Sequence, residues 1–574
     1  MAVIQNDSCR VLLVPEQGDA PALSGLPVVF YTAGQTVAQA VYLSGLFLPP
    51  ALCSGLARCG RCRMRLMPSE NARLPDPTEA DRACFTSDEL DAGMRLTCRV
   101  FPTPGLVAEL PPGTRLLAEP DAVQQTAAHH KARKDAPGRC GPQPTAGGGA
   151  RLAIDLGTTS LQWRLLAPGT ASACNRPEIL WEGGMINPQM GAGSDVVSRI
   201  AVSLRSGGRE RLRDITLKTL QALCAESEAR LPGHAGGPGC LCLAGNTAMT
   251  AITLGLDTSG LAAAPYSIPY TGGGFENLPG LPPVWIPPAL SPFVGGDISA
   301  GYAFLALGPE PPRHPFLLAD MGTNGEFLLV LSPDKALAAS VALGPALEGI
   351  GLRHGTEARP GAVTDFSASP AGLMPGLLPG MAEGMSPDLS PPGGAGAGRN
   401  TVGITGSGYL ALLDVLLRFG GMDRDGHFIP GKRLFPLERT QNGEERLLLP
   451  GKLALYASDV EEALKVKAAF SMGLRRLLET AGIGPGALAR VYLAGALGLH
   501  AKTGALENLG FFPPGMLGRI TVTGNTSLAG AALLACRAQS RDALVAWSAR
   551  VEPLDLAGDP AFAGGFASRM RFVW

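Results

Sequence analysis

The pattern of apolar and polar positions separates the chain into two regions that favour different folds. Near the N-terminus, the apolar runs VLLVP (11–15) and LPVVFYT (26–32) are typical of strands, and TVAQAVYLSG (36–45) is typical of a short helix with Thr36 as its N-cap. From residue 151 onward, strand and helix patterns alternate, as an α/β fold requires. The first region is therefore predicted to be a small α+β domain and the second a larger α/β part.

Composition marks the boundary between these regions. Residues 112–149, which include AAHHKARKDAPGRCGPQPTAGGG, are rich in Ala, Gly, Pro and charge and cannot bury much apolar surface, so we predict a flexible linker. The linker separates a domain of residues 1–111 from an α/β part that begins at residue 150. A second stretch rich in Gly, Pro and Met, residues 366–400, is predicted to be a mobile surface insertion.

The α/β part contains an internal repeat. LAIDLGTTSLQWRLL (152–166) is echoed by LLADMGTNGEFLLV (317–330), and both strings have the pattern strand, tight turn, strand. CLCLAGNTAM is echoed in the same way by RVYLAGALGL, each an apolar strand that runs into a glycine turn. The repeat predicts two similar halves, 150–315 and 316–574.

Charge and composition exclude several classes of protein. The chain of 574 residues has 48 basic and 49 acidic residues, so it has no electrostatic footprint for nucleic acid or an anionic membrane. It contains no uncharged apolar run of membrane-spanning length and no signal peptide pattern, and we expect a cytoplasmic protein. Twelve cysteines in such a protein favour metal ligation or buried thiols over a disulfide framework.

Three of these cysteines are close together, in the string ALCSGLARCGRCRMRL, and a fourth follows in GMRLTCRV. A cluster of two irons needs four thiolates, and Gly55 and Gly60 give the loop the freedom to bring three of them together. The predicted metal ligands are Cys53, Cys59, Cys62 and Cys98.

Two alternatives to an iron-sulfur cluster stay open, structural zinc and buried thiols. Zinc sites usually pair two short C-x2-4-C knuckles, and here the second knuckle is missing. Cys84 competes with Cys98 for the fourth position, but the surrounding DRACFTSDEL is polar and has the pattern of a surface helix. The remaining cysteines show no ligand spacing and are expected to be structural.

The repeated hairpins predict two phosphate-binding turns. Asp155 and Asp320 each end a strand, and each is followed by glycine and by hydroxyl or amide residues. Backbone N–H groups in such a turn bind anions, and the aspartate can hold magnesium through water or position an attacking water. The residues predicted to contact phosphate are Gly157, Thr158, Thr159, Gly322, Thr323 and Asn324.

These turns resemble the phosphate loops of the actin, Hsp70 and sugar kinase superfamily, whose two RNase-H-like domains clamp ATP. The resemblance implies glycine turns for the nucleoside, and two stretches look like them, GITGSGYLALLDVLL (403–417) and YLAGALG (492–498). Packing alone would also explain glycine at either stretch. The residues implied at the nucleoside are Gly406, Ser407, Gly408 and Gly495.

The cysteine region, GQTVAQAVYLSGLFLPPALCSGLARCGRCRMRL followed by RLTC, resembles a 2Fe-2S ferredoxin domain of β-grasp fold, with the C-x5-C spacing of the adrenodoxin-like branch. A ferredoxin domain ahead of this ATPase fold is uncommon. Together with NPQMGAGSDVVSRI, LAGNTAMTAITLGL, PFVGGDISAG, GPALEGIGLRHG and GNTSLAGA, it makes the chain similar to the reductive activators of corrinoid proteins.

This resemblance implies an ATP-dependent enzyme that passes one electron from its 2Fe-2S cluster to the Co(II) corrinoid of a partner protein and regenerates Co(I). The implied cofactors are the cluster, ATP and Mg²⁺. The implied partners are a corrinoid protein and an external low-potential electron donor, with a possible homodimer. DGHFIPG (425–431) misses the spacing of a base-off cobalamin motif, so we expect the corrinoid on the partner.

One departure and two alternatives accompany the resemblance. Family members have a middle domain between linker and ATPase, whereas here only about 40 mostly polar residues precede the ATPase pattern, so we expect that domain to be missing. A metabolite kinase with a fused redox sensor is the chief alternative, with Asp297 in GGDISAG as its catalytic base. A non-catalytic ATP-dependent scaffold that stores a cluster is the other.

Overall fold

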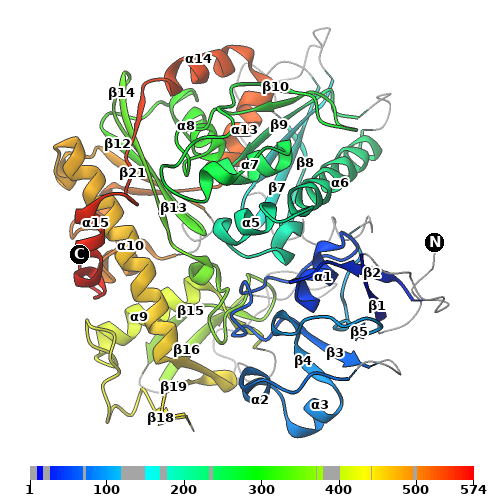
Figure 1. The fold of residues 1–574 in the computed structure, drawn as a ribbon. Helices are drawn as coiled ribbons and strands as arrows, with labels where there is room; N and C mark the ends of the chain where they lie inside the picture. The colour runs from blue at the N-terminus through cyan, green and yellow to red at the C-terminus, as the bar shows by residue number, and fades with distance from the viewer. Residues whose placement is uncertain are drawn as a thin grey trace, which may run out of the picture. The chain divides into compact units, whose positions relative to one another are not determined.

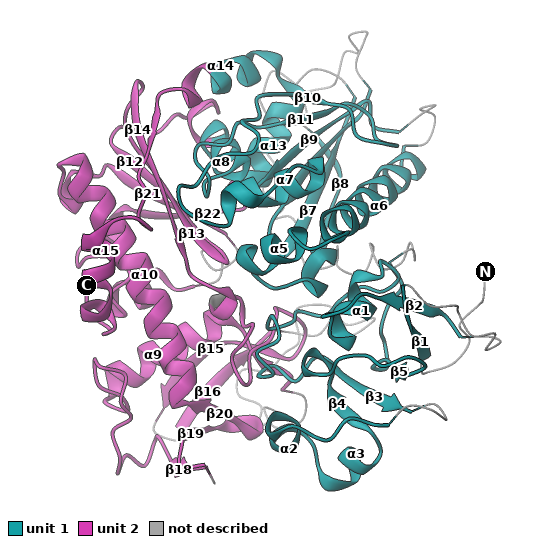
Figure 2. Cartoon of the chain, in the orientation of Figure 1, with its two compact units in different colours: residues 1–304, 527–545 teal, residues 305–526, 546–574 magenta. Residues whose placement is uncertain are grey.

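A computed structural model gives the fold, and it describes residues 10–16, 26–68, 73–117, 149–168, 178–231, 237–369, 372–378, 401–440, 442–495 and 501–574 (Figure 1). The chain forms two compact units (Figure 2). Unit 1 comprises residues 1–304 and 527–545, and unit 2 comprises residues 305–526 and 546–574.

Unit 1 begins with a small domain built on a five-stranded sheet in the order β2-β1-β5-β3-β4. Its strands are β1 (Arg10–Pro15), β2 (Val28–Tyr31), β3 (Arg63–Met67), β4 (Met94–Leu96) and β5 (Val107–Glu109). Its helices are α1 (Val37–Leu43), α2 (Glu79–Cys84), α3 (Ser87–Asp91) and the 3-10 turn η1 (Thr97–Arg99). Thr36 caps α1 in a reciprocal capping box with Gln39, and the predicted α+β pattern is confirmed.

The small domain extends beyond the predicted boundary at residue 111. Leu48 N donates to Arg115 O at 2.9 Å, and Leu117 N donates to Leu46 O at 2.9 Å. These bonds hold residues 115–117 against the segment that leaves α1. The rest of the predicted linker, residues 118–148, lies outside the described residues.

The larger part of unit 1 is a six-stranded sheet in the order β10-β11-β9-β6-β7-β8. Its strands are β6 (Arg151–Leu156), β7 (Ser160–Leu166), β8 (Ile179–Ile186), β9 (Cys240–Gly245), β10 (Gly274–Glu276) and β11 (Val284–Ile286). Its helices are η2 (Pro188–Gly191), α5 (Val196–Ser203), α6 (Gly208–Ala229), α7 (Thr247–Leu254), η3 (Ser259–Leu261), α8 (Gly296–Ala306), α13 (Thr526–Cys536) and α14 (Ala538–Ser548), of which the last three cross the unit boundary by a few residues.

Unit 2 is built on a second six-stranded sheet, in the order β22-β21-β12-β13-β14-β23. Its strands are β12 (Phe316–Met321), β13 (Asn324–Ser332), β14 (Lys335–Ala342), β21 (Arg490–Ala494), β22 (Ile520–Gly524) and β23 (Val551–Pro553). Its helices are η4 (Pro345–Glu348), α9 (Gly406–Phe419), η5 (Pro450–Lys452), α10 (Ala457–Ala481), η6 (Pro485–Ala487), α12 (Thr503–Asn508), η7 (Leu517–Arg519), α15 (Pro560–Phe566) and η8 (Ala567–Arg569).

The two six-stranded sheets confirm the repeat. In unit 1 the β6–β7 hairpin lies beside β9, which is parallel to β6, and in unit 2 the β12–β13 hairpin lies beside β21 in the same way. The register places Asp155 opposite Ala244 and Asp320 opposite Ala494. Each aspartate therefore lies at the same end of its sheet as the glycine turn that follows the neighbouring strand.

Unit 2 carries two further small sheets, β16-β15-β17 and β18-β19-β20. Their strands are β15 (Ala362–Ser369), β16 (Gly372–Leu377), β17 (Gly403–Ile404), β18 (Leu437–Arg439), β19 (Glu445–Leu449) and β20 (Leu453–Tyr456). The prediction of a surface insertion from residue 366 is wrong for its first part, because Phe366 and Leu373 are buried in the core of unit 2. Residues 379–400 lie outside the described residues. Within the described ranges, none of the helices has the length and apolar character needed to cross a bilayer.

Candidate functional site

The four predicted cluster ligands line one cavity of about 190 Å³ in unit 1. Cys53 and Cys62 are buried, and Cys59 and Cys98 are half-buried. Cys98 lies in η1, directly after β4, so a short turn and not a strand supplies the fourth thiol.

The loop between the first two thiols turns sharply. Ser54 and Ala57 both have left-handed backbone angles, with φ of 47° and 57°, and Gly55 and Gly60 are left-handed as well. Side chains other than glycine rarely adopt this conformation. The strained loop brings Cys53 and Cys59 onto the same cavity.

The thiols are paired two by two. The Cys59 thiol and nearby backbone N–H groups donate to the Cys53 sulfur and lower the pKa of Cys53. The Cys62 thiol donates to Cys98 and lowers its pKa as well. Among the described residues, no three or more His, Cys, Asp or Glu side chains form a ready-made metal site. Four thiols on one cavity nevertheless have the number and chemistry that a 2Fe-2S cluster requires.

Cys84 ends α2 next to this loop but does not line the cavity. A Cβ placed on Gly60 would lie 3.4 Å from Cys84 Sγ, so Cys84 packs behind the loop. Burial raises the pKa of its thiol. The position of Cys98 on the cavity favours it over Cys84 as the fourth ligand.

The first phosphate turn, at the end of β6, is closely packed. A Cβ on Gly157 would lie 2.8 Å from the Ser160 carbonyl, so the turn accepts only glycine there. Asn246 Nδ2 donates to Thr158 Oγ1 at 2.8 Å, and the backbone N–H of Asn187 donates to the Thr159 carbonyl at 2.8 Å. Hydrogen bonds therefore fix the turn from both sides.

Asp155 precedes this turn and has two notable neighbours in unit 1. Ser527, at the start of α13, donates its hydroxyl to Asp155 Oδ1 at 2.8 Å. Asp297, in the first turn of α8, has its pKa raised to about 7 by burial and by the negative charge of Asp155. A carboxylate pair of this kind favours a shared proton or a divalent cation.

The second phosphate turn, in unit 2, has a different set of contacts. Gly322 N donates to Asn324 O at 3.0 Å and closes the turn after Asp320. The Thr323 hydroxyl donates to Glu348 Oε1 at 3.0 Å. The structure thus places the three residues predicted for this hairpin, Gly322, Thr323 and Asn324, in one turn, and the turn also faces the carboxylate of Glu348.

The two glycine turns predicted for the nucleoside need glycine for different reasons. Gly495 has φ of 88°, and a Cβ there would lie 2.5 Å from Asp320 Oδ1, so this turn packs directly against Asp320. Gly406, Ser407 and Gly408 open α9, where Thr405 caps Gly408 N at 3.2 Å. A Cβ on Gly408 would lie 2.4 Å from the Val363 carbonyl, so packing accounts for this glycine.

Several residues of the site were not predicted from sequence as site residues. They are Asn187, Arg199, Asn246 and Ser527. One signal was available for two of them, because the string G-N-T recurs at 245–247 and 524–526, each time between a strand and a helix. Asn187 and Arg199 lie in the string NPQMGAGSDVVSRI that carries the resemblance, but nothing in the string itself points to their contacts with the turn after Asp155.

Two family models match consecutive parts of the chain. One describes the RACo middle region and matches residues 150–308, and the other describes the C-terminal domain of RACo, the ASKHA domain, and matches residues 314–574. The expectation that the middle domain is missing is therefore wrong. The middle region is the first half of the repeat. Because its β6–β7 hairpin has the same pattern as the β12–β13 hairpin, the sequence pattern assigns it to the ATPase domain.

Similar proteins agree with these models. The chain is 25% identical over 447 residues to the corrinoid activation enzyme RamQ of Eubacterium limosum. This match spans 73% of this chain and 70% of the relative. It is 30% identical over 250 residues to the [Co(II) methylated amine-specific corrinoid protein] reductase of Methanosarcina barkeri, spanning 42% of this chain and 43% of the relative.

A solved structure extends the likeness to the whole fold. The reductive activator for corrinoid, iron-sulfur protein covers 98% of this chain and 98% of its own, with a TM-score of 0.61 and 21% identity. This likeness shows the shared fold. The two RACo models together match 420 of the 574 residues, 159 and 261 residues respectively, and they show that the chain belongs to the RACo family.

Proposed function

We propose that this protein is an ATP-dependent reductive activator that passes one electron from a 2Fe-2S cluster to the Co(II) corrinoid of a partner protein. The observation that carries the proposal is the convergence of four thiols on one cavity in a chain that also has two hairpins with an aspartate and a glycine at the turn. The names of the relatives in Eubacterium limosum and Methanosarcina barkeri support the corrinoid protein as the partner.

Each cofactor has a set of residues that would hold it. Cys53, Cys59, Cys62 and Cys98 would hold the cluster, which supplies a single electron at low potential when bound. The N–H groups and hydroxyls of the turns at 157–159 and 322–324 would bind the phosphates of ATP. Asp155 and Asp320 would hold Mg²⁺ through water and orient the water that attacks.

ATP is needed because the electron transfer is uphill. Plant-type clusters have potentials near about −400 mV, and a gap of about 200 mV to the corrinoid would cost about 4.6 kcal/mol per electron. Binding that favours the Co(I) state about 10⁴-fold supplies about 5.5 kcal/mol. Hydrolysis at the two turns would then release the partner. An external low-potential donor would reload the cluster, and a homodimer and a cytoplasmic location belong to the same proposal.

A metabolite kinase is the second candidate, and one observation favours it. Burial, and after it the negative charge of Asp155, raise the pKa of Asp297 to about 7, which suits a general base. A kinase, however, has no use for four clustered thiols.

Product analysis separates these two functions. The cluster-loaded, reduced protein is mixed with MgATP and a Co(II) corrinoid protein, and free phosphate is measured. The activator is expected to release phosphate faster when the corrinoid protein is added, with no phosphorylated metabolite. Transfer of the γ-phosphate to a sugar or acid, unaffected by the corrinoid protein, would establish the kinase instead.

A further inference from the structure

The segment 187–199 joins the first phosphate turn to the cysteine loop. Asn187 is 1% exposed, and its side-chain amide donates to the Gly157 carbonyl at 2.8 Å. Arg199 is fully buried, and its guanidinium donates to the Thr158 carbonyl and, at 3.0 Å, to the Gly193 carbonyl. Both side chains thus hold the back of the phosphate turn.

The other end of the segment is bonded to the cysteine loop. Ser54, the residue after Cys53, accepts from the backbone N–H of Ser194 at 2.7 Å. The Ser54 hydroxyl also contacts Ser194 Oγ at 2.8 Å and Asp195 Oδ2 at 2.9 Å. Asp195 is at the same time the N-cap of α5, where it accepts from Ser198 N at 2.8 Å. The cysteine loop is therefore hydrogen-bonded to the N-terminal end of α5.

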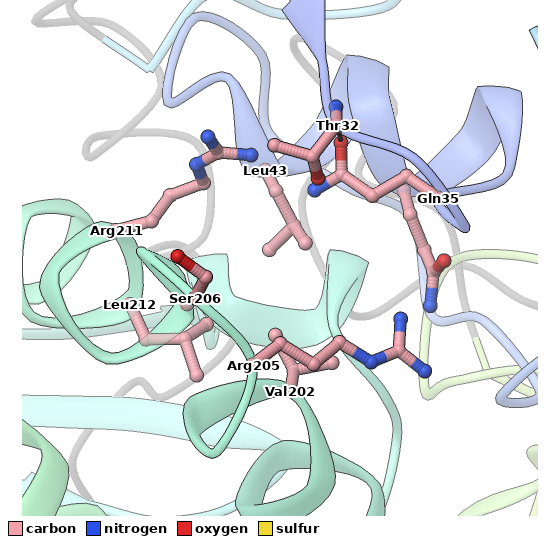
Figure 3. Close-up of a pocket in the computed structure, with 10 residues that line it drawn as sticks. Thr32, Gln35, Leu43, Val202, Arg205, Ser206, Arg211 and Leu212 are labelled. Carbon is pink, nitrogen blue, oxygen red and sulfur yellow. Dashed lines mark hydrogen bonds between the residues drawn. The ribbon is translucent and has the colours of Figure 1, made fainter.

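The surrounding surfaces fit closely at this contact. A Cβ on Gly191 would lie 2.6 Å from Tyr42 Cβ of α1, so η2 touches the small domain at a glycine. Next to this contact, a small cavity of about 20 Å³ separates Thr32 and Gln35 from Arg205 and Ser206 (Figure 3). The cavity that the four thiols line is walled on its other side by residues 190–193.

We propose that Asn187 and Arg199 are positioning residues that transmit phosphate binding at the 157–159 turn to the cysteine loop, through Ser194, Asp195 and Ser54. This inference rests on the nucleotide site of the proposed function. According to this proposal, nucleotide binding stabilises the contact between the middle region and the small domain that would hold the cluster.

The chemistry of the peptide group explains why phosphate binding should strengthen, and not weaken, the bonds of Asn187 and Arg199. A bound phosphate accepts from the N–H groups of Thr158 and Thr159, whose peptide units carry the carbonyls of Gly157 and Thr158. Because hydrogen bonds in a chain polarise and strengthen one another, phosphate on the N–H side strengthens the bonds from Asn187 and Arg199 on the carbonyl side. Nucleotide therefore tightens the 187–199 segment and the cysteine loop bonded to it.

Hydrogen exchange of the full-length, cluster-loaded protein tests the proposal, with Mg²⁺ and a non-hydrolysable ATP analogue as the probe. We expect the analogue to slow exchange at the 157–159 turn, in residues 187–199 and in the loop at 53–59. The effect in the loop is expected to be about fivefold, the scale of one net hydrogen bond.

Variants at Ser54 and Asp195 distinguish a loss of coupling between the phosphate turn and the cysteine loop from a folding defect. Ser54→Ala should keep the response of the phosphate turn, lose that of the cysteine loop, and weaken binding of the analogue by the same factor of about five, because coupling is reciprocal. Asp195→Asn, which keeps the helix cap and removes the charge, should reduce the loop response in part. Ser87→Ala, an exposed position in α3 of the same domain, should behave as the wild type.

Two results would overturn the proposal. One is protection of the phosphate turn with no change in the cysteine loop of the wild type, and the other is a full loop response in Ser54→Ala. Absence of protection at the phosphate turn itself would contradict both this inference and the nucleotide site on which it rests. Visible circular dichroism of the cluster checks that each variant is loaded.

Discussion

Ser527 donates its hydroxyl to Asp155 at 2.8 Å, although the two residues are 372 positions apart in the sequence. The bond brings the start of α13 to the end of β6, and both residues belong to unit 1. In the proposed function Asp155 would hold magnesium through water, and this hydroxyl would fix the orientation of its carboxylate.

Replacing Ser527 by alanine should lower the rate of ATP hydrolysis about tenfold, since hydrogen bonds to charged groups contribute about 1.5 to 3 kcal/mol. The cluster spectrum should be unchanged. Steady-state phosphate release measures the effect, and Ser568→Ala, at an exposed position near the C-terminus, serves as the control. Wild-type hydrolysis in Ser527→Ala would show that Asp155 does not depend on this bond.

Gly495→Ala should abolish ATP hydrolysis, because the added Cβ would lie 2.5 Å from Asp320 Oδ1 and displace the carboxylate. Gly482→Ala is the matched control. Gly482 has a similar positive φ of 69°, but a Cβ there meets nothing within 4 Å. The control should cost about 1 kcal/mol of stability from backbone strain and keep its hydrolysis. Equal activity of the two variants would remove Asp320 from the site.

Cys98→Ser should disrupt the visible absorption of the cluster and reduce the iron content, whereas Cys84→Ser should leave both unchanged. The reason is that Cys98 lines the cavity of the four thiols and Cys84 packs behind it. Iron and acid-labile sulfide analysis of anaerobically purified protein is the measurement, and two of each per chain are expected. The reverse pattern would reassign the fourth ligand.

Lys467 in α10 should make stability depend on alkaline pH. Its ammonium donates to the carbonyls of Arg569 and Val573, and burial lowers its pKa to about 8 from an ordinary 10.5. Between these two values the unfolded chain binds a proton that the folded chain does not, so this group makes the free energy of unfolding rise as the pH increases from 8 to 10.5. Below pH 8 the lysine is protonated in both states, and its unfavourable contribution to the free energy of unfolding no longer changes with pH.

Chemical denaturation of wild type and Lys467→Met at several pH values isolates this contribution, because other groups titrate in both proteins. The difference in unfolding free energy between the two should change between pH 8 and 10.5. Lys465→Met, on the same helix but at a partly exposed, ion-paired position, should show no such change. A pH-independent difference for Lys467→Met would mean that the buried amine titrates normally.

The sequence predicts the parts of the site that have a local pattern. The hairpins that begin at Asp155 and Asp320 are visible because strand, glycine turn and strand lie next to one another in the chain, and the cysteine spacing is visible for the same reason. The contacts that organise these parts are not visible. Ser527 reaches Asp155 only through the packing of α13, and Arg199 looks like an ordinary charged helix residue until burial reveals its two carbonyl partners.

The error about the middle domain has a related cause. The polar composition of residues 112–149 suggested that no domain precedes the ATPase, whereas the middle region is itself half of the repeat, at residues 150–308. Composition distinguishes a linker from a domain. It does not distinguish two domains that share one strand pattern.

The most direct test of the account is the formation of Co(I) in a partner. The reduced, cluster-loaded protein is mixed anaerobically with a Co(II) corrinoid protein, and the Co(I) absorption band is followed with and without MgATP. We predict that the band appears only with MgATP, that the cluster is oxidised by one electron for each Co(I) formed, and that Cys98→Ser gives no band. Co(I) formation that needs neither MgATP nor the cluster, or no Co(I) under any of these conditions, would contradict the account.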